Sequence, residues 1–226
     1  MSNEAVYLVP IGSGRFDLYT EPSDEAESMG RGHPAFLGRV IERIRDAWRQ
    51  MKHAATAPGD RTGRLTRIRD WVVCRIAESI AEQRTLWSLR TLTSATFIFP
   101  SDLSETSAAS IRSRVLMRAR RQHGWWLLLN TLGVILTAIL VLLPGPNLIG
   151  YYFLFRVVAH YLSWSGARHA LEGVLWRPTA EPALTELGTL ARLPREARAS
   201  RVAAIASQLR LTRLEAFFDR VAVPVP

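Results

Sequence analysis

The first part of the chain holds two short runs rich in β-branched and aromatic residues, as β-strands are. Residues 6–11 and 15–20 are short β-like runs, and the GSG sequence at 12–14 between them is typical of a hairpin turn. Pro10 predicts that the first strand lies at a sheet edge, because proline has no N–H to donate to a neighbouring strand. The pattern therefore predicts an N-terminal β-hairpin over residues 1–21.

The pattern then becomes helical. An acidic and then glycine-rich linker at 22–34 leads into two amphipathic stretches, 35–51 and 65–80, whose apolar residues recur three and four positions apart. These stripes predict an antiparallel helix pair that serves packing, within a soluble helical region over 35–123. Residues 91–100 are rich in β-branched and aromatic side chains, which predicts a short strand.

The most apolar part of the chain consists of two runs. Residues 125–143 carry no formal charge and would form a helix roughly 28 Å long, close to the hydrocarbon thickness of a bilayer. The PGPN sequence at 144–147 predicts a turn, and a second apolar run follows at 148–167. We therefore expect a transmembrane helical hairpin over 124–177. A buried helical hairpin inside a soluble domain is the alternative.

Charge supports the membrane interpretation. The net charge is +9, and Lys52 is the only lysine, so nearly all the basic residues are arginine. Arginines precede the first apolar run without an acidic residue among them, as expected next to anionic lipid headgroups on the cytoplasmic side. These candidate membrane-surface residues are Arg112, Arg114, Arg118, Arg120 and Arg121. Trp125 and Trp126 then fit an interfacial aromatic belt. Nucleic acid is not an expected partner, because aromatic and basic residues do not interleave.

The second apolar run contains polar residues that simple membrane anchoring does not require. Tyr152, Arg156 and His160 are four residues apart and share one helix face. Arg156 could be satisfied by Asn130 on the other helix, by backbone carbonyls, or by reaching toward water. His160 could act in proton-linked movement, or this pair could simply fix the hairpin. Glycines at 150 and 166 would allow close backbone approach.

Other chemistry is sparsely represented. The two apolar runs hold no Asp or Glu, which argues against a complete cation carrier. The single cysteine and five scattered histidines give no metal site, and no catalytic or nucleotide-binding motif occurs, so neither an enzyme nor a cofactor is expected. Residues 178–226 hold short amphipathic helices. The expected fold is mainly α, with the small N-terminal β-hairpin, the amphipathic helix pair, the internal transmembrane hairpin and these C-terminal amphipathic helices.

The sequence PGPNLIGYYFLFRVVAHYLSWSGARHAL over 144–171 resembles the signature of the mitochondrial K+–H+ exchange-related family, and YLVPIGSGRFDLY over 7–19 resembles the family's opening. Residues between 22 and 100 hold no matching motif. The matching positions in the hairpin are Pro144, Pro146, Asn147, Tyr151, Tyr152, Phe155, Arg156, His160, Gly166, His169 and Leu171.

This resemblance implies a membrane protein associated with potassium–proton exchange. We expect an accessory or oligomeric component rather than a complete carrier; a structural membrane-anchored interaction protein without a transport role is the alternative. Candidate ion-linked, proton-linked or hairpin-fixing residues are Asn147, Tyr151, Tyr152, Arg156, His160 and His169. The expected partners are the lipid bilayer and either further copies of the chain or a larger membrane protein. The N-terminus lacks a transit-like leader, which predicts a bacterial cytoplasmic membrane; a eukaryotic member would lie in the mitochondrial inner membrane.

Overall fold

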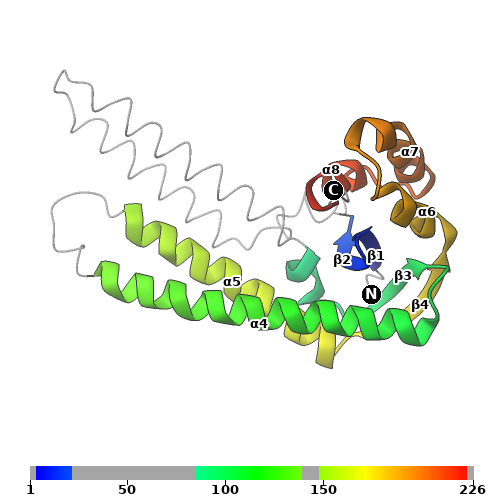
Figure 1. Cartoon of the computed structure of the whole chain (residues 1–226). Helices are drawn as coiled ribbons and strands as arrows, with labels where there is room; N and C mark the ends of the chain where they lie inside the picture. Colours follow the sequence, from blue (N-terminus) through cyan, green and yellow to red (C-terminus); the bar gives the residue numbers. More distant parts are fainter. Residues whose placement is uncertain (1–3, 22–84, 139–147, 223–226) are drawn as a thin grey trace, which may run out of the picture. The chain divides into compact units, whose positions relative to one another are not determined.

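The computed structural model describes residues 4–21, 85–138 and 148–222, which form two compact units, each built from separate stretches of sequence. We call the first the sheet unit, and its described residues are 4–21, 89–118 and 167–222. We call the second the helical unit, and its described residues are 85–88, 119–138 and 148–166. The elements in chain order (Figure 1) are β1 (Glu4–Gly12), β2 (Arg15–Thr20), β3 (Ser94–Pro100), α4 (Glu105–Ala138), α5 (Leu148–Glu172), β4 (Leu175–Glu181), α6 (Pro182–Leu190), α7 (Arg195–Gln208) and α8 (Leu214–Val221).

A four-stranded mixed sheet organises the sheet unit, with strand order β2-β1-β3-β4. β1 and β2 are antiparallel, whereas β1 pairs with β3, and β3 with β4, in parallel. The β1–β2 turn uses positive φ at Ser13 (52°) and Gly14 (68°), as a two-residue hairpin loop requires. The predicted hairpin is thus present, and the short strand predicted within residues 91–100 is confirmed as β3. The expected fold was wrong in that it lacked β4 and the four-stranded sheet that these strands form together.

The prediction that Pro10 places β1 at a sheet edge was also wrong. β1 has a neighbour on each side, but β3 pairs only with its first part, Glu4 to Tyr7. Pro10 lies beyond that stretch and pairs with Phe16 of β2 alone, next to an irregularity in the register. The strand therefore has an edge-like end where the missing N–H costs no ladder hydrogen bond.

β4 replaces the helix that was expected to continue to residue 177. α5 ends at Glu172 and is followed by Gly173, whose N–H donates to the carbonyl of His169 (2.7 Å). Leu175 then donates its N–H to the carbonyl of Thr93 (3.0 Å), and the following residues pair with β3. The glycine favours the end of the helix, and β3 offers backbone hydrogen-bond partners to the residues that follow. Together these two features outweigh the helical pattern of the sequence.

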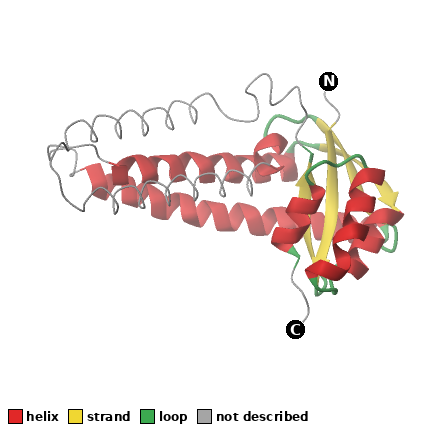
Figure 2. Ribbon diagram, turned by 90° about the horizontal axis from the view of Figure 1, so that it is seen from above, coloured by secondary structure: helices red, strands yellow, loops and turns green. Residues whose placement is uncertain are grey.

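The main core of the sheet unit lies between the hairpin and α6, α7 and α8, which lie beside the strands (Figure 2). Alternate residues of β1 point into it, as the two-residue repeat of a strand dictates. Its largest buried members include Tyr7, Tyr19, Leu184, Leu187 and Phe218. Amphipathic helices were predicted in this C-terminal region, and their apolar faces form this core.

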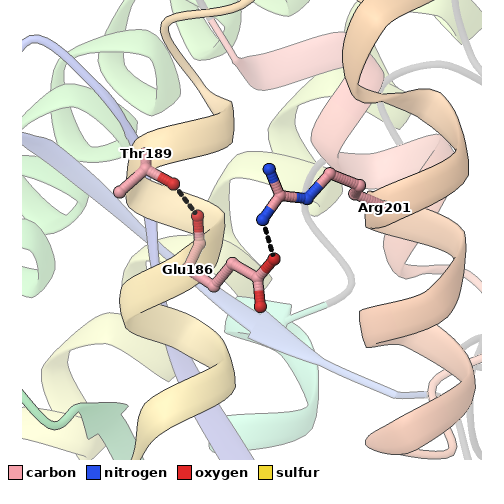
Figure 3. Close-up of polar contacts among 3 residues, drawn as sticks. All are labelled: Glu186, Thr189 and Arg201. Atoms are coloured by element: carbon pink, nitrogen blue, oxygen red, sulfur yellow. Dashed lines mark hydrogen bonds and ion pairs between the residues drawn. The ribbon is translucent and has the colours of Figure 1, made fainter.

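An ion pair links α6 to α7 at the surface, beside a hydrogen bond within α6. Arg201 of α7 forms an ion pair with Glu186 of α6 (2.6 Å), while the Thr189 hydroxyl donates to the carbonyl of Glu186 (2.8 Å) (Figure 3). Both charged side chains are about half exposed, and an exposed pair of this kind contributes only about 0–1 kcal/mol. The buried leucines therefore dominate this contact.

In the helical unit, α4 and α5 run side by side (Figures 1 and 2). Glycines permit the approach: a Cβ added to Gly133 would lie 2.6 Å from the Phe153 ring. At Gly166 an added Cβ would lie 1.7 Å from the carbonyl oxygen of Leu86, in the helical segment 85–89. The close approach predicted for Gly166 is confirmed. Trp87 of that segment donates its ring N–H to the Ser163 hydroxyl (2.9 Å).

The prediction of a transmembrane hairpin was wrong. Among the residues that the structure describes, no helix is long and apolar enough to cross a membrane. α4 begins at Glu105, so its first half is the arginine-bearing segment, while α5 contains Arg156, His160 and Arg168. The end of the first apolar run and the PGPN turn, residues 139–147, lie outside the described residues, as does the predicted helix pair at 35–51 and 65–80.

Candidate functional site

A polar cluster lies between α4 and α5 in the helical unit. α4 contributes His123 and Trp126, and α5 contributes Arg156 and His160. The two histidines join through their Nδ1 atoms, which are 2.9 Å apart. Each pair of residues is three or four positions apart on its helix, so both side chains face the same neighbour. This arrangement places a cation and two imidazoles within one helix–helix contact.

The Trp126 ring lies against both of the α5 residues in the cluster. It is nearly parallel to the ring of His160, at 16° and 6.2 Å between centroids, and the Arg156 guanidinium lies 5.8 Å from its centre. An aromatic face attracts a guanidinium, but it provides no lone pair that accepts a hydrogen bond in the plane of the cation. Arg156 is thus held by the ring without its charge being neutralised.

Two buried nitrogens of the cluster lack hydrogen-bond partners. These are Arg156 Nε and His160 Nε2, for which no partner exists among the described residues. A buried donor or acceptor left unpaired costs roughly 1–3 kcal/mol. Groups of this kind are uncommon in folded proteins and mark strain or a function.

Burial and charge keep both histidines neutral. Burial lowers the pKa of His160 to about 3, and the charges of Arg156 and then His123 act in the same direction. Burial and then the charge of Arg156 lower the pKa of His123 to about 4. At pH 7 one imidazole therefore donates and the other accepts in the bond between them. In this conformation His160 does not titrate near neutral pH.

The other residues predicted around Arg156 are arranged differently. Asn130 is buried, but its side chain donates to the carbonyl of Trp126 (2.6 Å) in its own helix, so this amide group is engaged within α4. The Tyr152 ring meets Phe153 edge-on at 5.7 Å. Tyr151 belongs to α5, but its side chain, like the whole of Asn147, lies outside what the structure describes.

His169 and the arginine segment belong to other surroundings. His169 lies in the sheet unit, where its Nε2 is 2.9 Å from the carbonyl of Leu92, just before β3. Arg112 is half-buried, and its guanidinium covers the rings of Phe97 and Trp176 at 4.7 and 4.6 Å. Burial lowers its pKa. The remaining candidates for membrane-surface binding are exposed or half-buried: Arg114, Arg118, Arg120 and Arg121.

Sequence reasoning missed His123 and Trp126 as members of the cluster. His123 was one histidine among scattered ones, and Trp126 was interpreted as part of an interfacial belt. The spacing of these residues did contain a signal, because positions 123, 126 and 130 fall on one helical face. Asn130 is a polar residue in an apolar run, which indicates that this face packs against another element. Among the described residues, no group of three or more His, Cys, Asp or Glu side chains could hold a metal ion.

Acidification should destabilise the folded chain through the histidine pair. The folded pKa values of His123 and His160, about 4 and about 3, lie below the ordinary 6.5. The unfolded chain therefore binds protons first as the pH falls, so the free energy of unfolding decreases below about pH 6.5 and is unaffected above it. We expect a loss of the order of 4 kcal/mol between pH 7.5 and pH 5, about 2 kcal/mol for each histidine, measured by urea unfolding. A His123→Asn/His160→Asn variant should lose less unfolding free energy over the same pH range. A loss equal to that of the wild type would show that the histidine pair is not its cause.

The chain matches the sequence model of one family, described as mitochondrial K+-H+ exchange-related, over residues 5–174. The match covers more than half of the chain, including α4 and α5 with the polar cluster, and stops before β4. Neither a curated protein nor a solved structure matches the chain.

Proposed function

Because the chain belongs to the mitochondrial K+–H+ exchange-related family, we propose that it serves potassium–proton exchange as an accessory component that binds a membrane surface through α4. The family's name relates the chain to potassium–proton exchange and to a mitochondrial membrane. The accessory role, the lipid surface as partner and the kind of membrane, bacterial in the sequence-based prediction, are the parts that we propose.

The observation that carries the proposal is an exposed apolar face on the second half of α4. Trp125 and Ile135 are each 62% exposed. We call this surface the α4 apolar face, and it comprises Trp125, Leu128, Leu129, Leu132, Ile135 and Leu136. Its members lie three, four and seven positions apart, opposite the side that meets α5. Exposed apolar surfaces of this extent mark interaction sites with lipid or protein.

Charge next to the α4 apolar face favours an anionic lipid surface as the partner. Arg121 lies four residues before Trp125 and is exposed, and Arg120 is half-buried beside it. A helix with an apolar stripe and arginine beside it lies in the headgroup region of an anionic bilayer, where apolar burial and charge attraction add together.

Two features argue for an accessory role rather than a complete carrier. The only acidic residues of α4 and α5 are Glu105 in the first turn of α4 and Glu172 at the end of α5. The polar cluster itself holds a cation and neutral imidazoles, and neither attracts K+. A potassium pathway would therefore require ligands from outside α4 and α5.

Polar substitutions in the α4 apolar face should weaken membrane binding. Each leucine removed from lipid contact costs roughly 1.5–3 kcal/mol, so a Leu128→Gln/Leu132→Gln variant should bind vesicles of phosphatidylcholine and phosphatidylserine at least about tenfold more weakly. Vesicle flotation measures this binding. The matched control is Leu175→Gln, because Leu175 is 64% exposed but lies on β4 in the sheet unit.

The outcomes separate lipid from protein partners. If the double variant changes the oligomeric state measured by light scattering while vesicle binding stays as in the wild type, the face binds a second copy and the lipid proposal is wrong. For the accessory role, liposomes that contain only this chain should show no K+/H+ flux above empty liposomes; flux from the pure chain would overturn it. An absence of any effect on exchange when the chain is removed from its native membrane would favour the structural alternative.

A further inference from the structure

Among the residues that the structure describes, no acidic side chain pairs with the cation of the polar cluster. Arg156 carries a guanidinium cation, and its Nε–H is a hydrogen-bond donor that accepts none. Burial leaves this nitrogen without an acceptor among the described residues. Glu105 and Glu172 are the acidic residues of α4 and α5, and both lie in the sheet unit, where Glu172 pairs with Arg168 at 3.0 Å.

A second unpaired nitrogen lies on the same face of α5. His160 is four residues after Arg156, and its Nε2 is buried without a partner among the described residues. The Nδ1 contact with His123 leaves two arrangements of protons: when His160 accepts at Nδ1, its own hydrogen is on Nε2. In that tautomer Arg156 and His160 present two N–H donors that lack an acceptor.

We propose that Arg156 and His160 form a binding site for a small carboxylate anion. A guanidinium fork binds the two oxygens of a carboxylate in its plane through Nε–H and a terminal N–H, which is the geometry that arginine favours. His160 Nε2–H donates to the same anion. Trp126 covers the guanidinium from one face and so fixes its orientation. The Arg156 side chain is half-buried as a whole, and a ligand that reaches its Nε and the Nε2 of His160 must displace the contacts that bury these two atoms.

Binding of the anion favours proton uptake by the histidine pair. Among the described residues, the charged and titratable groups that act on His160 are Arg156 and His123. A bound carboxylate neutralises Arg156 and thereby removes the charge that, after burial, most opposes protonation of His160. Affinity should therefore rise as the pH falls. The inference concerns the helix contact itself and does not depend on the proposed binding of lipid.

The test uses the purified full-length chain and sodium acetate as the probe. Titration with 13C-labelled acetate at constant ionic strength, followed by NMR, should show saturable binding, and calorimetry in two buffers should show proton uptake. Arg156→Gln should weaken binding at least tenfold, and Arg156→Lys should weaken it severalfold because lysine keeps the charge but not the fork. His160→Gln should remove the proton uptake. Arg168→Gln is the matched control on α5, because Arg168 is exposed and paired, and it should bind within twofold of the wild type.

Each result decides the assignment. The site is overturned if the wild type shows no saturable acetate binding. It is also overturned if Arg156→Gln and Arg156→Lys bind acetate as tightly as the wild type does. Chloride that binds as tightly as acetate overturns the carboxylate assignment, because it shows that charge alone selects the ligand. Circular dichroism and urea midpoints of each variant establish folding, and the Arg156→Lys variant keeps the test valid if Arg156→Gln does not fold.

Discussion

Replacement of Gly166 with alanine should destabilise the folded chain by about 3 kcal/mol or more. The new Cβ would lie 1.7 Å from the carbonyl oxygen of Leu86, and backbone atoms on both sides of the contact cannot move aside as a flexible side chain could. The α5 helix would have to separate from the 85–89 segment, which would also break the hydrogen bond between Trp87 and Ser163. Urea unfolding followed by circular dichroism measures the change.

Gly124→Ala is the matched control. Gly124 also lies in a long helix, but its added Cβ would meet only the Trp164 side chain, at 3.3 Å. Alanine is favoured over glycine inside a helix by roughly 0.5–1 kcal/mol, which offsets a small movement of that ring. We therefore expect a change of less than about 1 kcal/mol in either direction. Similar losses for the two variants would show that helix propensity or flexibility, rather than the Leu86 contact, sets the effect.

Phe218→Ala should cost about 3–5 kcal/mol of unfolding free energy. Phe218 is fully buried in the core between the hairpin and the C-terminal helices. The Arg198 guanidinium lies 5.1 Å from the centre of its ring, and Arg198 itself is buried, with a distant ion pair to Asp219 (3.6 Å). Removal of the ring therefore opens a cavity and takes away the cation–π contact of a buried charge. Urea unfolding followed by tryptophan fluorescence measures the loss.

The neighbouring Phe217→Ala provides the comparison. Phe217 is only partly buried and packs against the Tyr19 ring at 4.8 Å. We expect it to cost roughly 1–2 kcal/mol. A loss at Phe218 no larger than that at Phe217 would mean that the helices after the family match contribute little to the core. The expected difference instead makes α8 an integral part of the fold, although the match ends at residue 174.

The sequence predicted local structure well where one segment determined it. The β1–β2 turn follows from residues 12–14, whose two glycines supply positive φ. The close approach at Gly166 also followed from a small residue on a helix face. The extent of the sheet could not be predicted in this way, because β4 exists only through its parallel pairing with β3, and the two strands are separated by α4 and α5. Pro178 in β4 further obscures the strand pattern.

The polar cluster was half predicted for a similar reason. Arg156 and His160 stand out because they interrupt an apolar run. Trp126 does not interrupt such a run, and His123 precedes it among polar residues, so neither has a local signal that separates it from its neighbours. Only the pairing of α4 with α5 brings a second histidine to His160. The membrane-spanning interpretation followed from apolarity counted along the chain, whereas α4 distributes its residues between an exposed apolar face and a polar side toward α5.

The parallel pairing of β1 with β3 constrains how the chain can be made. β1 leaves the ribosome before its strand partner β3 and before the helix that carries Phe218, which follow only after long intervening stretches. Contacts between residues so distant in sequence form slowly, because a large loop must close before they contribute. The newly made hairpin therefore exposes an apolar sheet face until α8 has been synthesised. A truncated or stalled chain should aggregate for this reason and depend on chaperones that cover β-strands.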